Sequence, residues 1–209
     1  MKECINAVKE RRSIVAFEAG KNIPEETLKD ILNVANMSPS SMNLQPWEVK
    51  AVISPEKKKI LRACANNQPK VEEASATLII IANPKAVEEN IDKVLNNWIE
   101  IGNMQEQSKE IYKKMSLQLY TDDIMSKTRT VFAVKNTAFF AMSIMIAARF
   151  FGFETHPMDG INEAEIKKNF NIEEYKIIPL LIAIGYPKKG FKLNVRGLRR
   201  PLDEFVEYL

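Results

Sequence analysis

The stretch SPSSMNLQPW, residues 38–47, contains more hydrogen-bonding side chains than a simple turn requires. Its three serines and two side-chain amides can donate to carbonyl oxygens and ring nitrogens, or accept from N–H groups. Pro46 stiffens the exit of this loop, and Trp47 is expected to anchor it in the core rather than to stack on a ligand. A loop of this composition is suited to holding a flat polar ligand.

Arg11, Arg12 and Ser13 form a second candidate segment, at the end of a predicted helix. Two guanidinium groups and a hydroxyl suit a phosphate, because arginine presents planar N–H donors to phosphate oxygens. Adjacent arginines at a helix C-terminus more often face water and complement the helix dipole. Alone, this segment is therefore a weak indication of a phosphate site.

The third segment is THPMDG, residues 155–160, which follows a predicted strand. Gly160 can adopt backbone conformations closed to other residues, so the main chain could come close to a ligand there. By itself the segment also fits an ordinary strand-to-helix turn. His156 is interpreted as structural filler rather than as a proton donor.

Several kinds of site are excluded by what the sequence lacks. The single histidine cannot form a zinc site built on several histidines, and no HExxH motif occurs. There is no GxSxG, GxGxxG or Walker motif. Cys4 and Cys64 form no CxxC pair, so we expect neither a metal site nor a disulfide framework.

The composition suits one globular domain over residues 1–209, because 45% of the residues are hydrophobic and 27% are charged. A net charge of +3 gives no strong case for a nucleic-acid partner. The first residues are charged where a signal peptide is apolar, and the charge-free segment 136–148 is too short to span a bilayer. We therefore expect a cytoplasmic protein with no membrane partner.

Hydrophobic periodicity predicts the elements that must position these three segments. Helices are predicted at residues 3–10, 24–37, 54–64, 131–151 and 163–170. Strands are predicted near residues 47–53, 77–82, 153–158 and 177–185. The mixture without strict alternation predicts an α+β fold, with a central sheet flanked by helices.

Some expectations concern particular faces and regions. Trp47, Val49, Ala51 and Ile53 alternate as the buried face of a strand, and the run 77–82 is expected to be buried on both faces. Lys57-Lys58-Lys59 is expected to lie on a solvated helix face. Residues 85–128 form a polar region that reads as helical, and a helical excursion or lid is predicted near residues 95–130. The tail near residues 190–209 has little internal pattern.

Four motifs occur together in a fixed order along almost the whole chain. They are RRSxxxF at residues 11–17, PSSxNxQPW at 39–47, GxxTxPMxG at 152–160 and IPxLxAIGYP at 178–187. In this arrangement the sequence resembles the FMN-dependent nitroreductase family, and PSSxNxQPW is the most specific part of the likeness.

The resemblance implies a nitroreductase-like fold, with a mixed or antiparallel sheet, in an entwined homodimer that holds two FMN molecules at the subunit interface. It implies that NAD(P)H passes a hydride through flavin N5 to an electrophilic small-molecule acceptor, such as a nitroaromatic or a quinone, by a ping-pong mechanism. The flavin carries the chemistry, so no side chain is expected to be catalytic.

The resemblance also assigns the cofactor-binding residues. Arg11, Arg12 and Ser13 match the phosphate contacts, with Arg199 or Arg200 added from the C-terminal tail. The loop that approaches the flavin, in part from the other subunit, is matched by Pro39, Ser40, Ser41 and Asn43. The family's contact to the pyrimidine edge of the flavin corresponds to Asn67, with its neighbour Gln68. The family's segment over the flavin ring corresponds to Pro157, Met158, Asp159 and Gly160.

One position departs from the family pattern. Val15 stands two residues after the RRS serine, where members often carry a lysine or arginine beside flavin N1. A cation there stabilises the reduced flavin, so its absence should lower the reduction potential. Lys70 is proposed as a replacement. Two other functions stay open: an FMN-binding carrier or sensor without significant turnover, and a reductase dedicated to one substrate.

Overall fold

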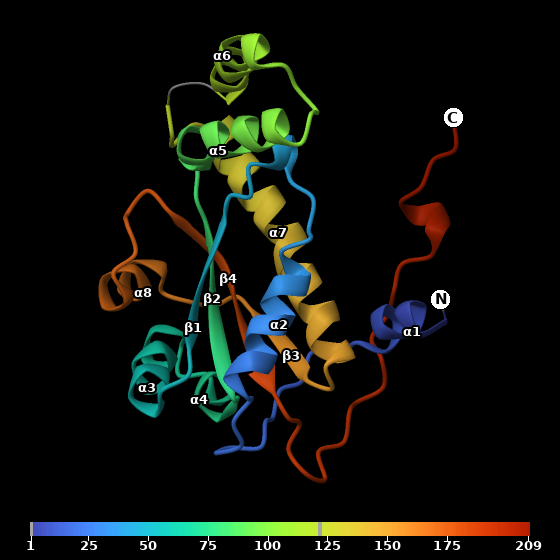
Figure 1. Cartoon of the computed structure of the whole chain (residues 1–209). Coiled ribbons are helices and arrows are strands. Elements are labelled where there is room, and N and C mark those ends of the chain that lie inside the picture. The colour runs from blue at the N-terminus through green and yellow to red at the C-terminus, as the bar shows by residue number, and fades with distance from the viewer. Residues whose placement is uncertain (1, 121–122) are drawn as a thin grey trace.

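The computed structural model, which describes residues 2–120 and 123–209, confirms the α+β prediction. Its sheet has four strands in the order β1-β2-β4-β3, and every pair is antiparallel. The strands are β1 (Trp47–Val52), β2 (Ala76–Ala82), β3 (Glu154–Met158) and β4 (Ile177–Gly185). Helices cover both faces of this sheet (Figure 1).

The central strand β2 separates two hydrophobic cores. All seven of its residues are buried, as the apolar run predicts. Because side chains alternate along a strand, Ile79 and Ile81 pack into one core, whereas Leu78 and Ile80 pack into the other. The neighbouring strand β4 divides its residues between the same two cores.

Each face of the sheet has its own set of helices. One face is covered by α2 (Glu25–Ala35) and α7 (Lys127–Phe150). The other is covered by α3 (Pro55–Cys64), the short α4 (Pro69–Glu73) and α8 (Glu163–Phe170). Ser54 caps α3 and Asn162 caps α8, each by accepting a main-chain N–H with its side chain.

Helix α7 explains the long apolar segment of the sequence. In the described part of the chain it is the one helix long and apolar enough to cross a membrane, but 56% of its apolar window is buried inside the protein. Trp47 stacks on Phe140 of α7 with ring centroids 5.0 Å apart and 3° between the ring planes. Trp47 therefore anchors the 38–47 loop in the core, as expected.

The polar region 85–128 contains α5 (Ala86–Glu100) and α6 (Lys109–Tyr120), which lie beyond one end of the sheet (Figure 1). A 3₁₀ turn, Glu106–Ser108, precedes α6. Arg129 of α7 is fully buried and pairs with Glu88 of α5, which holds the excursion to the body of the fold. Residues 121 and 122 of the predicted excursion lie outside the described residues.

The two ends of the chain lie on the same side of the molecule (Figure 1). Helix α1 (Lys2–Glu10) ends just before Arg11, and its apolar residues Ile5 and Val8 are exposed. Beyond residue 190 the tail is irregular, apart from a 3₁₀ turn at Leu202–Glu204. Figure 1 shows this tail extending away from the sheet.

Two expectations about faces are wrong. Ala51 of β1 and Ile53, just after the strand, are exposed and Val52 is buried, because the strand contacts cores on both faces of the sheet. Lys58 is not solvated: it is only 7% exposed, and its Nζ donates to the carbonyl oxygen of Ala74 at 2.7 Å. Ala74 directly follows α4, a helix that the sequence periodicity did not predict.

Candidate cofactor site

A cluster of cations surrounds Arg11 where α1 ends. The Nη1 atom of Arg11 is buried and has no hydrogen-bond partner in the described part of the chain. Burial lowers the pKa of Arg11, and the nearby charges of Arg196 and Arg199 lower it further, although Glu154 opposes them. A guanidinium with one buried, unpartnered nitrogen among like charges is poorly compensated, so the cluster is suited to an anion such as a phosphate.

The C-terminal tail brings Arg196 and Arg199 close to Arg11. Two hydrogen bonds hold the tail beside the end of α1. Arg12 donates from Nη2 to the carbonyl oxygen of Asn194 at 2.8 Å. Arg196 donates from Nη2 to the carbonyl oxygen of Lys9 at 2.5 Å. Sequence reasoning missed Arg196, because only these long-range contacts distinguish it from other surface arginines of the tail.

The resemblance suggests either Arg199 or Arg200 as a C-terminal phosphate contact, and the two residues lie in different surroundings. The charge of Arg199 acts on Arg11, and its Nη1 donates to the carbonyl oxygen of Leu198 at 2.9 Å. The guanidinium of Arg200 lies 5.4 Å from the ring centroid of Phe205. Arg199 is therefore the better placed of the two to join the cation cluster.

The Arg11–Ser13 segment runs beside β3. Ser13 forms an isolated parallel bridge with Thr155, and the N–H of Ile14 donates to the carbonyl oxygen of Thr155 at 3.1 Å. Arg149 of α7 pairs with Glu10 at 3.0 Å and with Glu154. These contacts bring the Arg11–Ser13 segment and the 155–160 segment together.

The end of β3 is held by a turn at residues 66–68. Asn66 donates from Nδ2 to the carbonyl oxygen of Gly160 at 2.8 Å, and Gln68 donates from Nε2 to that of Asp159 at 3.2 Å. Gly160 has a φ of 73°, which favours glycine. Met158 buries its side chain in the core, so only its main chain is available to a ligand.

Asn67 and Lys70 stand beside this turn. Asn67 has a left-handed φ of 54°, and its N–H donates to the carbonyl oxygen of Arg62 at 3.0 Å. Its side chain is exposed, whereas that of Gln68 is committed to Asp159. Lys70 lies in α4, and its charge acts on His156 of β3.

The 38–47 loop is also preorganised. Met42, Asn43 and Gln45 have φ values of 52°, 53° and 45°, in the left-handed region. Ser40 Oγ accepts from the N–H of Gln45 at 2.9 Å, and Ser41 Oγ lies 2.5 Å from the hydroxyl of Tyr120. Many of the polar groups of this loop therefore hold its own backbone in place. The exposed Pro39, near the start of the loop, also restricts the backbone.

Within one chain this loop lies far from the Arg11 cluster. The N–H of Ser41 donates to Asn136 Oδ1 at 3.0 Å, whereas Arg149, near the other end of α7, holds Glu154. Asn136 and Arg149 are separated by about 20 Å at a helical rise of about 1.5 Å per residue. Figure 1 shows the connection between α2 and β1 near α5, and α1 beside the opposite end of α7.

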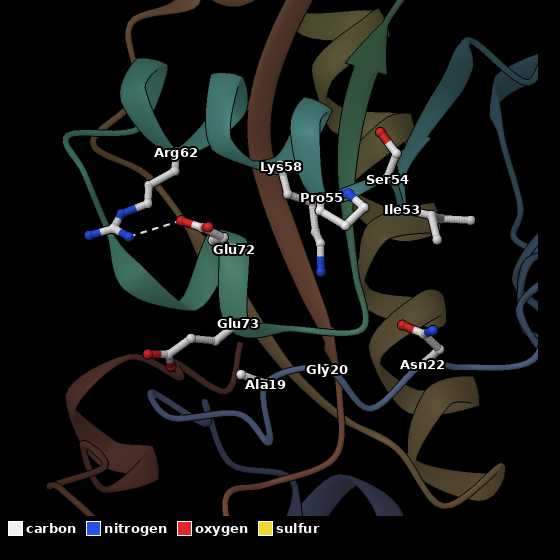
Figure 2. A pocket seen from close by; sticks show the side chains of 10 residues that line it. All are labelled: Ala19, Gly20, Asn22, Ile53, Ser54, Pro55, Lys58, Arg62, Glu72 and Glu73. Atoms are coloured by element: carbon white, nitrogen blue, oxygen red, sulfur yellow. Dashed lines mark hydrogen bonds and ion pairs between the residues drawn. The ribbon is translucent and has the colours of Figure 1, made fainter.

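A separate cavity of about 610 Å³ lies against α3 and α4 (Figure 2). It is lined by Lys58 and by the Arg62–Glu72 ion pair, whose N–O distance is 2.9 Å. Figure 2 shows the amine of Lys58 pointing away from α3 toward this space. None of the predicted cofactor residues lines the cavity, so it is distinct from the candidate site.

Comparison of the sequence with known protein families identifies the family of this chain. The sequence model described as "Nitroreductase family" matches residues 8–186, which is most of the chain. The chain belongs to the nitroreductase family. The matched region includes Arg11, the 38–47 loop and the turn at Gly160.

Curated relatives of this nitroreductase-family chain are similar over nearly the full length. "Putative NAD(P)H nitroreductase MhqN" of Bacillus subtilis is 31% identical, with 100% of each chain covered. The "NADH dehydrogenase" of Thermus thermophilus is 27% identical, with 96% of this chain and 93% of the relative covered.

Solved structures of nitroreductase-family proteins have the same fold. The "putative nitroreductase ydfN" from Bacillus subtilis aligns with a TM-score of 0.93 at 28% identity, with 100% of both chains covered. A "putative nitroreductase" from Exiguobacterium sibiricum 255-15, solved in complex with FMN, aligns with a TM-score of 0.87 at 25% identity, covering 98% of this chain and 96% of that one. The family and these neighbours establish a nitroreductase-like fold.

Proposed function

We propose that this protein is an FMN-dependent oxidoreductase that passes a hydride from NAD(P)H to an electrophilic acceptor such as a nitroaromatic, a quinone or an enone, in a reducing cytoplasm. The observation that carries the proposal is the buried, unpartnered Nη1 of Arg11 among cations, beside the strand β3 that leads to the turn at Gly160. Support also comes from the FMN complex of the Exiguobacterium neighbour and from the names of the relatives.

The described residues fit the parts of FMN. Arg11, Arg196 and Arg199 would hold the phosphate, because they supply positive charge that the protein itself leaves poorly compensated. The exposed amide of Asn67 would contact the ring edge, and the main chain of residues 157–160 would lie against the ring. When bound, FMN supplies hydride transfer at N5, while the protein supplies orientation and electrostatics.

The separation of about 20 Å between the two halves of the predicted site supports a homodimeric arrangement. The Ser40–Ser41 loop of one chain would complete the site whose phosphate end lies in its partner. Val34 and Phe139 are exposed on the face opposite the sheet, and Val195 and Leu198 of the tail are 95% and 87% exposed. A second copy of the chain, packed against the first in a homodimer, would bury these side chains.

Such a site would serve both substrates in turn. If residues 157–160 cover one ring face, the nicotinamide and the acceptor must share the other. The two substrates then cannot be bound together, so ping-pong kinetics are expected. Double-reciprocal plots of NAD(P)H oxidation at several acceptor concentrations should be parallel, whereas intersecting lines would indicate a second acceptor site.

The cofactor and assembly are tested on the purified protein. We expect a yellow protein that releases FMN rather than FAD on denaturation, and that sediments as a dimer whose stability increases with FMN concentration. Recovery of FAD, or no flavin uptake after incubation with FMN, would overturn the cofactor assignment. A stable FMN-loaded monomer would overturn the shared site.

The second candidate function is a flavin carrier or sensor. Val15 favours it, because this side chain is 53% exposed at a position where a cation would assist flavin reduction. Anaerobic addition of NADH or NADPH separates the two functions. Bleaching of the flavin absorbance, followed by recovery with an acceptor, supports the oxidoreductase, and failure to bleach with either reductant supports the carrier.

A reductase with one dedicated acceptor is compatible with the same chemistry. The "CLA biosynthesis enone reductase" of Lactiplantibacillus plantarum is 26% identical, with 84% of this chain and 81% of that protein covered. Enones therefore belong in the acceptor screen beside nitroaromatics and quinones.

A further inference from the structure

His156 occupies the middle of the candidate site. It is the only histidine in the sequence, and it lies in β3 between Thr155, which bridges to Ser13, and the segment that ends at Gly160. Its Nδ1 atom is buried and has no hydrogen-bond partner within the described ranges. Leaving such a polar atom unsatisfied costs about 1–3 kcal/mol, so a partner supplied by a ligand would be stabilising.

The charges of the two cations assigned to the two ends of the cofactor both act on this imidazole. Burial, then the charge of Lys70, and finally that of Arg11 lower the pKa of His156 to about 4, against a raising interaction with the main chain of Ile14. At neutral pH the ring is therefore uncharged. A neutral imidazole nitrogen either accepts or donates one hydrogen bond, depending on the tautomer.

We propose that Nδ1 of His156 hydrogen-bonds a hydroxyl group of the ribityl chain of FMN. Arg11 belongs to the phosphate end of the site and Lys70 to the ring end, and the part of FMN between phosphate and ring is this polyol chain. A hydroxyl both donates and accepts, so it satisfies Nδ1 in either tautomer. The inference rests on the proposed FMN site and makes His156 a binding residue rather than filler.

Two substitutions separate the hydrogen bond from simple packing. His156→Phe keeps a flat ring without the nitrogen, and His156→Asn keeps a polar atom near the position of Nδ1. FMN dissociation constants are measured by flavin fluorescence titration, and apoprotein stability by thermal unfolding. We expect His156→Phe to weaken FMN binding by about tenfold, as for loss of one hydrogen bond. His156→Asn should recover most of that loss.

Equal FMN affinity in the wild type and in both variants overturns the inference, while the proposed function stands. If the wild type itself fails to bind FMN, the proposed function and the inference both fail. Nitrogen NMR of the single histidine gives a readout that does not depend on variants that fold. The Nδ1 resonance of the wild type should shift when FMN is added, and an unchanged resonance at saturation overturns the contact.

Discussion

Asn66 and Gly160 are joined by a hydrogen bond of 2.8 Å between the side-chain amide and the main-chain carbonyl oxygen. Both residues have left-handed φ values, 51° for Asn66 and 73° for Gly160. The bond therefore connects two turns that are 94 residues apart in the sequence. It fixes the end of β3, where the main chain is proposed to face the flavin ring.

Substituting Asn66 with Ala should loosen this turn. Loss of the hydrogen bond costs about 1 kcal/mol, which corresponds to a decrease in FMN affinity of about fivefold. Asn67→Ala is the matched control, because its exposed side chain is proposed to contact FMN directly. It should lower FMN affinity as well. Alanine disfavours the left-handed φ at both positions, so both variants should lower the unfolding temperature of the apoprotein. The decrease should be larger for Asn66→Ala, because this variant also loses the hydrogen bond to Gly160. Equal apoprotein stability in the two variants would contradict this role of Asn66.

Arg11→Ala should weaken FMN binding by about 2–4 kcal/mol, as expected when one side of a desolvated charge pair is removed. The same change relieves repulsion from Arg196 and Arg199, so the apoprotein should not be destabilised. Arg12→Ala, which removes a bond to the tail instead, provides a comparison. Thermal unfolding with and without FMN measures both effects. A stability loss in the apoprotein alone would indicate that Arg11 is structural.

Val15→Lys should raise the flavin reduction potential, because it adds positive charge beside the proposed position of the reduced ring. Lys70→Ala should lower the potential if Lys70 has taken that role. Spectroelectrochemical titration of each FMN-loaded variant measures the potential. Values equal to that of the wild type in both cases would show that neither side chain faces the flavin.

The burial of His156 also predicts a dependence of stability on pH. Its folded pKa of about 4 lies below the ordinary value of 6.5, so the unfolded chain binds a proton that the folded chain excludes. Stability should therefore fall as the pH decreases from about 6.5 to about 4. After allowance for partial exposure, the loss is about 1–2 kcal/mol.

Urea unfolding of the apoprotein over this pH range, compared with His156→Phe, isolates the contribution of this residue. The carboxylates titrate in both proteins, so their effect cancels in the difference. A difference in unfolding free energy that stays constant from pH 4 to pH 7 would show that His156 titrates normally in the folded protein.

The sequence alone determined the main elements of the fold and the three segments of the candidate site. The apolar run at residues 77–82 predicts the buried strand β2. The spacing of Leu28, Ile31, Leu32 and Ala35 predicts the inward face of α2, where Leu32 is half-buried and the other three are buried. These features follow from local periodicity, which reflects which side chains must leave water. The motifs around Arg11, Ser40 and Gly160 likewise identified the family that the comparisons confirm.

The tertiary structure alone decided which residues share an environment. In the sequence Lys58 is one of three consecutive lysines that look equivalent. In the structure it is buried against Ala74, because α4 packs beside α3. Arg196 joins Arg11 only because the tail folds back across α1. The isolation of His156 Nδ1 and the distance between Ser41 and Arg11 also depend on contacts between residues far apart in sequence. Local periodicity carries no information about such contacts, because it records only how each segment divides its side chains between core and water.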